Sequence, residues 1–240
     1  HGYSGLIRAI AGSTLAFFGL NIEFLLAHTM SRVVASLVEN YDYFPWMSLN
    51  AFNLWWIVAA GRGMEVSDKL LAIGIANAKT VGLLLFSSFY LFAVLRQLRE
   101  KKNILQSFLV SLIIVNAAFF LFQTESHDRY AFPLSVFLLL WAPFFRSIPR
   151  FLIFYTLFSI FYFYNLHTAL VDNYPNNGLP ILSWLTQTSG TIIVSIILIA
   201  LFCLFIVHVA KQTRPIVWII PVLLLILSIA AKNMPLVTKK

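Results

Sequence analysis

A compact group of hydrogen-bond donors and acceptors lies at residues 123–130, where the chain reads Gln-Thr-Glu-Ser-His-Asp-Arg-Tyr. The runs on either side are almost entirely apolar, so the polar group stands between two segments of membrane-embedded character. Burying one charged side chain at the midplane of a bilayer costs about 2.5 to 3.5 kcal/mol. We therefore expect Glu125, Asp128 and Arg129 to lie at a membrane interface or in a hydrated cavity.

Two interpretations of this polar segment stay open. In the first, Arg129 and His127 bind a phosphate, because guanidinium and imidazole groups donate hydrogen bonds to phosphate oxygens, and the Asp128 carboxylate orients them. In the second, the segment is a solvated loop that only connects two membrane spans. The spacing of the residues favours neither interpretation over the other.

The composition is that of an integral membrane protein, whose first partner is the lipid bilayer. The 240 residues are 60% hydrophobic and 11% charged, with a mean hydropathy of +0.85, whereas soluble domains carry roughly 25% charged residues. The net charge of +8 does not indicate nucleic-acid binding, because the basic residues lie between apolar runs, as topology signals do. Cys203 is the only cysteine, and no His, Cys, Asp or Glu pattern has metal-ligand spacing. We expect no cofactor and no divalent metal.

Apolar runs predict an all-α fold, a polytopic membrane bundle of about seven transmembrane helices that forms a single transmembrane domain over residues 1–240. A helix rises about 1.5 Å per residue, so roughly 20 residues cross the hydrocarbon core. Interfacial or re-entrant helices are expected between the spans, as at residues 30–38. The predicted spans are residues 6–27, 80–95, 104–122, 131–145, 151–170, 191–210 and 215–231.

A second polar segment, residues 28–79, carries charges of both signs and only short apolar runs. Within it, Ser48 or Asn50 is expected to cap a helix whose two adjacent tryptophans lie at headgroup depth. Asn50 and Asn53 are three residues apart, so they would share one face of that helix. Their side chains would then offer paired amides to a polar ligand.

The distribution of basic residues predicts the orientation in the membrane. The positive-inside rule puts residues 96–102 in the cytoplasm and the segments around Asn50 and His127 together on the extracytoplasmic face of a bacterial plasma membrane or an ER-type membrane. The basic residues of the predicted cytoplasmic side are Arg8, Arg96, Arg99, Lys101, Lys102, Arg146, Arg150, Lys211 and Arg214. The basic C-terminal tail opposes this scheme, which makes the last span its weakest element.

Two motifs carry a resemblance to a known family. The segment from Ser48 to Trp56, followed about seventy positions later by His-Asp-Arg-Tyr at 127–130 and by Pro133, resembles the C-terminal half of the Gpi18-like mannosyltransferases of the GT-C superfamily. These polytopic enzymes take a sugar from a polyprenyl phosphate donor on the extracytoplasmic side. Their usual second motif is His-Glu-Arg-Tyr, so Asp128 departs from it while keeping the charge.

The resemblance implies transfer of a mannose-like hexose from a polyprenyl-phosphate sugar to an extracytoplasmic acceptor. Arg129 and His127 would contact the donor phosphate, with Asp128 as their orienting partner. The residues that would line the substrate cavity are Asn50, Asn53, Glu125 and Tyr130. The catalytic base would be an aspartate of an earlier loop, upstream of this chain, in a missing N-terminal half or on a separate chain. We therefore expect no transferase activity from the 240 residues alone.

Two alternatives to an enzyme stay open. A non-catalytic membrane subunit agrees with the absence of a matching early loop. A transporter of lipid-linked substrates is disfavoured, because no internal repeat is visible and Pro133, Pro149 and Pro215 lie near span ends, not at the midplane.

Overall fold

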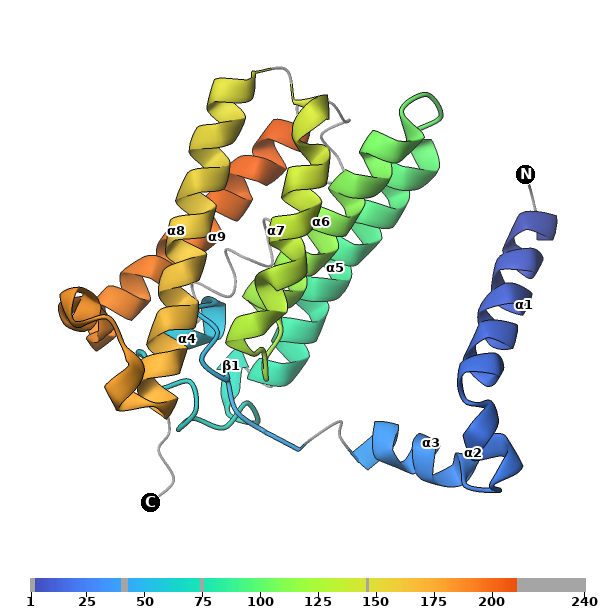
Figure 1. Cartoon of the computed structure of the whole chain (residues 1–240), viewed down its shortest axis with the longest axis horizontal. Helices are drawn as coiled ribbons and strands as arrows, with labels where there is room; N and C mark the ends of the chain where they lie inside the picture. Colours follow the sequence, from blue (N-terminus) through green and yellow to red (C-terminus); the bar gives the residue numbers. More distant parts are fainter. Residues whose placement is uncertain (1–2, 40–42, 74–75, 146, 211–240) are drawn as a thin grey trace. The chain divides into compact units, whose positions relative to one another are not determined.

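The computed structural model describes residues 3–39, 43–73, 76–145 and 147–210 (Figure 1). The chain divides into two compact units, His1–Phe44 and Pro45–Lys240. Helices dominate both, and one short two-stranded hairpin is present in the second unit. The predicted helical class is confirmed, whereas the prediction of one transmembrane domain stays a prediction.

The first unit contains three helices: α1 (Tyr3–Leu20), α2 (Ile22–Leu26) and α3 (Met30–Glu39). The run predicted to span at 6–27 is interrupted at Asn21, whose side-chain amide donates to the Phe17 carbonyl at 2.8 Å. Short amide side chains compete in this way with the regular helical bonds. The uninterrupted apolar stretch, Ile10–Leu20, is therefore shorter than a span. The helix predicted at 30–38 is confirmed as α3.

Among the described residues of the second unit, four helices are long and apolar enough to cross a membrane. They are α5 (Ala78–Arg99), α6 (Ile104–Phe122), α8 (Ile148–Asn173) and α9 (Thr188–Ala210). They contain the predicted spans 80–95, 104–122, 151–170 and 191–210. These helices agree with an integral membrane protein, but the predicted number of seven spans is not confirmed. The run 215–231 lies outside the described residues.

The run predicted to span at 131–145 forms three consecutive short pieces: the 3₁₀ turn η2 (Asp128–Ala131), the helix α7 (Phe132–Trp141) and the 3₁₀ turn η3 (Ala142–Phe144). Pro133 lies in the first turn of α7, where a missing N–H group costs no helical bond. Pro143 lies in η3, directly after α7. At 10 residues, α7 is too short to span a bilayer by itself.

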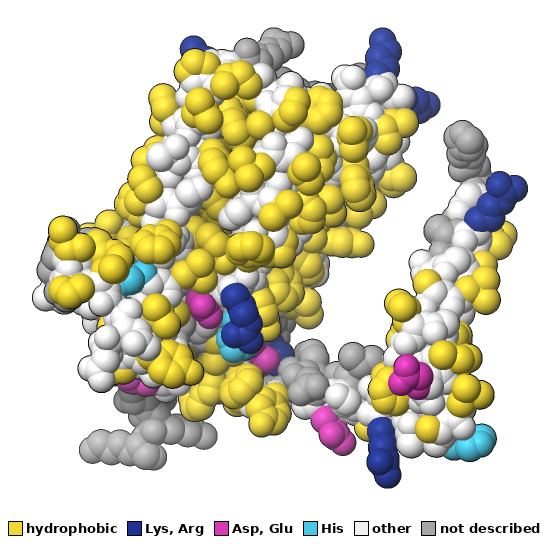
Figure 2. Space-filling model, in the orientation of Figure 1, with side chains coloured by type: hydrophobic (Ala, Val, Ile, Leu, Met, Phe, Trp, Pro, Cys, Tyr) yellow, Lys and Arg dark blue, Asp and Glu magenta, His cyan; other side chains and the backbone are white. Residues whose placement is uncertain are grey.

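Aromatic side chains fill the interior of the second unit. Phe89 stacks on Phe122 with ring centroids 5.1 Å apart, and Phe202 meets both rings edge-on. Outside this interior, many large apolar side chains of the spanning helices are exposed, and Figure 2 shows hydrophobic atoms covering the flank of the bundle. A flank of this kind suits contact with lipid, because an aqueous surface rarely carries so large an apolar patch.

The helices of the second unit alternate in direction, so their connections gather at two ends (Figure 1). The turn between α5 and α6, with its basic residues, lies at one end. The segments before α5 and between α6 and α7 lie at the other end, where they contact each other. A hairpin of β1 (Leu71–Ile73) and β2 (Ala76–Asn77) leads into α5 there.

Candidate functional site

The two polar segments identified in the sequence pair with each other. The Leu49 N–H donates to the Ser126 carbonyl at 2.9 Å, and Leu49 and Asn50 both form β-bridges with His127. Residues some seventy-five positions apart in the chain thus form one surface at the end of the bundle. We call this surface, made by residues 49–50 and 126–130, the polar junction.

A buried asparagine of α8 holds one side of the polar junction in place. The Asn165 amide nitrogen donates to the Asn50 carbonyl at 2.6 Å, and its oxygen accepts from the Phe52 N–H at 3.1 Å. Asn50 itself has a positive φ of 60°, which asparagine tolerates better than most residues. Asn165 is fully buried, so it is a positioning residue for the loop and not a lining residue of a cavity.

Asn53 has a structural role that differs from its predicted one. The short helix α4 (Leu54–Val58) begins after Asn53, whose side-chain oxygen caps it by accepting from the Trp56 N–H at 2.9 Å. The amide nitrogen donates to the carbonyls of Phe120 and Gln123, both at 3.3 Å. The predictions that Ser48 or Asn50 caps this helix, and that Asn50 and Asn53 share one helical face, are therefore wrong. The fully buried Asn53 offers no amide to a ligand.

The adjacent tryptophans are buried in the bundle, so their rings are not exposed as those of a headgroup anchor would be. The Trp55 indole N–H donates to the Phe122 carbonyl at 2.6 Å, and that of Trp56 donates to the Thr191 hydroxyl at 2.9 Å. A buried indole needs such a partner for its polar atom. The Phe122 carbonyl also lies against Gly82, where an added Cβ would come within 2.6 Å of it. α4, α5 and α6 therefore pack closely around this one carbonyl.

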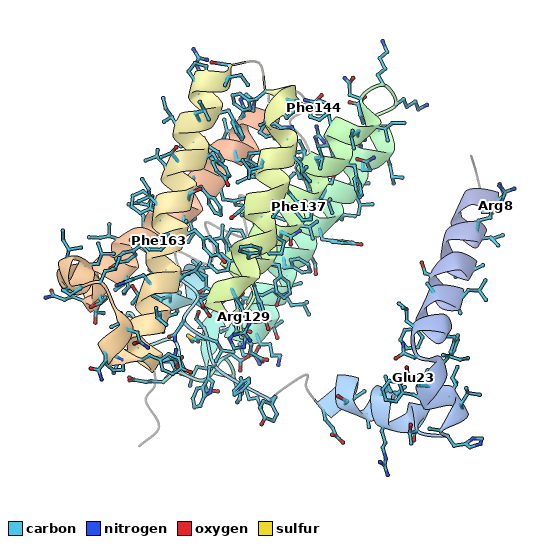
Figure 3. All side chains as sticks on the ribbon, viewed as in Figure 1. Arg8, Glu23, Arg129, Phe137, Phe144 and Phe163 are labelled. Atoms are coloured by element: carbon cyan, nitrogen blue, oxygen red, sulfur yellow. The ribbon has the colours of Figure 1, made fainter. Side chains whose placement is uncertain are left out.

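Arg129 is the exposed cation of the polar junction, and Figure 3 shows it near the start of α7. Its guanidinium carbon lies 5.9 Å from the centre of the Tyr130 ring, within cation–π range. The His127 ring meets the same tyrosine edge-on, with centroids 5.1 Å apart. These three side chains, out of the seven predicted site residues, therefore lie next to one another.

Asp128 acts on His127 through its charge, and its predicted role as the orienting partner of Arg129 and His127 stays a prediction. Asp128 is half-buried beside α8, where its charge acts on the buried Tyr162 hydroxyl.

The His127 imidazole is biased towards its neutral form. Partial burial lowers the pKa of His127, the positive charge of Arg129 lowers it further, and Asp128 partly offsets both. A neutral imidazole still donates one N–H bond to a phosphate oxygen. Because a bound anion would favour the charged form, we expect phosphate binding and His127 protonation to reinforce each other.

Glu125 points away from the exposed side of the polar junction and joins a charged cluster that the sequence did not reveal. Its carboxylate binds the Lys79 ammonium at 2.6 Å, and the buried Asp68 carboxylate lies beside it. The Thr124 hydroxyl donates to Asp68 at 3.2 Å. Asp68 and Lys79 escaped prediction because they belong to a segment without spanning runs, and no local pattern places them near residue 125.

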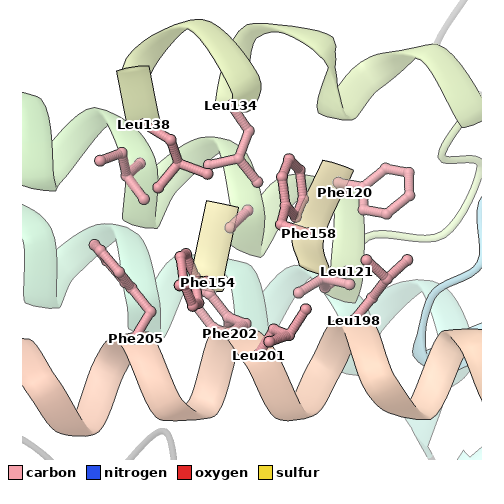
Figure 4. Close-up of a pocket in the computed structure, with 12 residues that line it drawn as sticks. Phe120, Leu121, Leu134, Leu138, Phe154, Phe158, Leu198, Leu201, Phe202 and Phe205 are labelled. Carbon is pink, nitrogen blue, oxygen red and sulfur yellow. The ribbon is translucent and has the colours of Figure 1, made fainter. Parts of the chain in front are cut away.

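A narrow apolar cavity lies deeper in the bundle, between α6, α7, α8 and α9 (Figure 4). About 380 Å³ of space, including open solvent at its mouth, lies between these helices. Phe120, Leu134 and Phe158 are among its lining residues, and all of its lining side chains are apolar. The cavity is therefore separate in character from the polar junction.

The polar junction combines an exposed guanidinium, a neutral imidazole and an aromatic ring, which together suit an anion better than a cation. No three His, Cys, Asp or Glu side chains gather as a metal site among the residues that the structure describes. No protein-family model, curated protein or solved structure matches this chain. The resemblance to the Gpi18-like enzymes therefore rests on the motif residues alone.

Proposed function

We propose that this chain is part of a membrane glycosyltransferase that moves a mannose-like hexose from a polyprenyl phosphate donor to an extracytoplasmic acceptor. Its polar junction would bind the donor phosphate through Arg129 and His127. The observation that carries this proposal is the pairing of residues 49–50 with His127. That pairing joins the two motifs of the family resemblance into one surface and leaves Arg129 exposed on it.

The surroundings of Arg129 favour a phosphate that is attached to a lipid. Its neighbours Tyr130 and Phe132 are 36% and 63% exposed, and they mark the boundary between the polar junction and the apolar flank of α7. A phosphorylated lipid could place its headgroup at Arg129 with its chain along that flank. The planar guanidinium can bind two phosphate oxygens at once, which a point charge cannot.

The topological part of the proposal follows from the charge distribution. The polar junction would face the extracytoplasmic side, and the basic turn between α5 and α6 would face the cytoplasm. In this proposal the chain would cross the membrane with the seven spans predicted from the sequence. Cysteine labelling from outside at the exposed positions Glu65 and Tyr130, compared with the exposed Lys101, tests the orientation.

The binding experiment compares wild type with Arg129→Lys. Affinity for a short-chain polyprenyl phosphate is measured in one detergent at one salt concentration, with folding checked by thermal melting. We expect the variant to bind roughly three- to tenfold more weakly, because lysine loses the second parallel hydrogen bond. Arg99→Lys, an exposed arginine at the opposite end of the bundle, is the matched control and should bind as wild type does. Equal affinity of the Arg129→Lys variant would remove Arg129 from the site.

A non-catalytic membrane subunit is the second candidate function, and the state of Glu125 favours it. This carboxylate is already bound to Lys79, so it is poorly placed to take a proton from an acceptor hydroxyl. Sugar transfer by the purified 240-residue chain would exclude the subunit role. Lipid-phosphate binding without transfer is expected for both candidates, because the catalytic base of the proposed enzyme would lie upstream of this chain.

A further inference from the structure

Asp68 is a fully buried carboxylate with one oxygen that lacks a partner. Its relative exposure is 0%, and its Oδ2 atom accepts from the Thr124 hydroxyl while Oδ1 has no hydrogen bond. An unpaired buried carboxylate oxygen costs several kcal/mol in general. Such an oxygen therefore needs a ligand, an ion or a proton as its partner.

The neighbour of that oxygen is a second carboxylate. Glu125 lies close enough to Asp68 for a hydrogen bond once one of the two is protonated. The other Glu125 contact is the Lys79 ammonium at 2.6 Å, with both side chains about one-fifth exposed. Lys79 from the start of α5 and Asp68 from the preceding segment are the charged groups that act on Glu125.

Two carboxylates and one ammonium leave this cluster with an excess negative charge when both acids are ionised. Two adjacent carboxylates in a poorly hydrated place do not ionise independently, and one of them retains its proton to a higher pH. Burial raises the pKa of Glu125, and the Asp68 carboxylate raises it further, against the opposing effect of Lys79. A proton from solvent on Glu125 would give the unpartnered Asp68 oxygen its missing donor.

We propose that protonated Glu125 donates a hydrogen bond to the Asp68 carboxylate and that these two groups, with Lys79, form a proton-dependent latch that holds the polar junction together. Two backbone hydrogen bonds join the latch to residues 45 and 46, just before the junction in the chain, and a third lies within the junction. Asp68 N–H donates to the Pro45 carbonyl at 3.1 Å, Glu125 N–H donates to the Trp46 carbonyl at 3.1 Å, and the Leu49 N–H bond to Ser126 follows directly. Loss of the proton from Glu125 would place two negative charges side by side and loosen this contact.

The direction of the pH effect follows from the raised pKa of Glu125. The folded state binds the proton more tightly than the unfolded state, so the latch contributes stability at acidic pH and loses it as the pH rises through the folded-state pKa. Between about pH 5 and pH 8, we expect the melting temperature of wild type to fall by about 2 to 4 °C. Hydrogen exchange, corrected for its intrinsic pH dependence, should show less protection at the Leu49 and Glu125 amides at the higher pH.

Glu125→Gln is the deciding variant, because its amide copies the protonated acid and can donate to Asp68 at any pH. We expect this variant to lose the pH-dependent shift and to melt above wild type at the higher pH. Asp68→Asn removes the charge of the second carboxylate and should also reduce the pH-dependent shift of the melting temperature. Glu65→Gln, an exposed acid of the same segment, is the matched control and should keep it.

Two results would contradict the proposal of a latch. One is a wild-type melting temperature and amide protection that do not change over this pH range. The other is a pH-dependent shift that persists unchanged in both Glu125→Gln and Asp68→Asn. Neither measurement involves phosphate or sugar, so the latch can fail or hold independently of the proposed function.

Discussion

The polar stretch between α6 and α7 has two halves that differ in what they contact. Thr124, Glu125 and Ser126 turn inwards, where they bind Asp68, Lys79 and the backbone of the opposite loop. His127 to Tyr130 turn outwards, with Arg129 exposed and the His127 ring only partly covered. One uninterrupted run of polar residues thus contains an anchoring half and a half that is available to a ligand.

The difference shows why polarity alone is a poor guide to function in a membrane protein. A buried polar side chain next to a bilayer needs partners within the protein, and Thr124 and Glu125 of the inward half have them. An exposed polar residue can form hydrogen bonds with water instead, so it needs few contacts within the protein. Changes to anchoring residues should therefore cost stability, whereas changes to outward residues should cost binding and leave stability unchanged.

The largest loss of stability is expected for Asn53→Ala. This substitution removes the α4 cap and leaves the buried carbonyls of Phe120 and Gln123 without a donor, which should cost about 2 to 4 kcal/mol. Asn103→Ala is the matched control, because Asn103 precedes α6 without a side-chain capping bond. Thermal melting in one detergent measures both. If the two variants melt alike, the anchoring role of Asn53 is refuted.

A smaller loss is expected for Gly82→Ala. The new Cβ would meet the Phe122 carbonyl at 2.6 Å and disturb its bond from Trp55, and overpacking of this kind typically costs about 1 to 3 kcal/mol. The same change at Gly12 places a Cβ where no atom lies within 4 Å. Gly12→Ala should therefore melt like wild type or slightly above it. A Gly82→Ala protein as stable as wild type would show that α5 does not approach α6 so closely.

The sequence predicted the helices of the second unit well but not the anchoring contacts. Long apolar runs with polar ends suffice to place α5, α6, α8 and α9, because span length and hydropathy are local properties. The contact of Asp68 with Glu125 is not local, since it joins residues 57 positions apart. The positive φ of 57° at Glu125 also depends on its bond to Trp46 and has no signal in the surrounding residues. The aromatic pair Trp55 and Trp56 was interpreted as a headgroup anchor because its partners, Phe122 and Thr191, are also distant in the sequence.

In the outward half, the expected effect is on binding and depends on pH. The His127 pKa is lowered, so its ring is mostly neutral near neutral pH and gains a positive charge as the pH falls through that pKa. Binding of phosphatidylglycerol, whose phosphodiester keeps a constant charge, should therefore strengthen about three- to tenfold from about pH 7.5 to pH 5.5. His127→Gln should bind with an affinity independent of pH. An equal pH response in both proteins would show that His127 does not face the anion.

The smallest change in melting temperature is expected when Arg129, the cation of the outward half, is replaced by a neutral residue. Arg129→Gln removes an exposed guanidinium whose contact within the described chain is the Tyr130 ring, and exposed contacts of this kind contribute at most about 1 kcal/mol. Lys79→Gln makes the same chemical change in the inward half, where it removes the ammonium that faces Glu125 beside Asp68. We expect Lys79→Gln to melt clearly below Arg129→Gln, because it leaves two partly or fully buried carboxylates without their counter-charge. Equal melting temperatures would mean that both cations are solvated alike, and the division of this stretch into an anchoring half and a ligand-facing half would not hold.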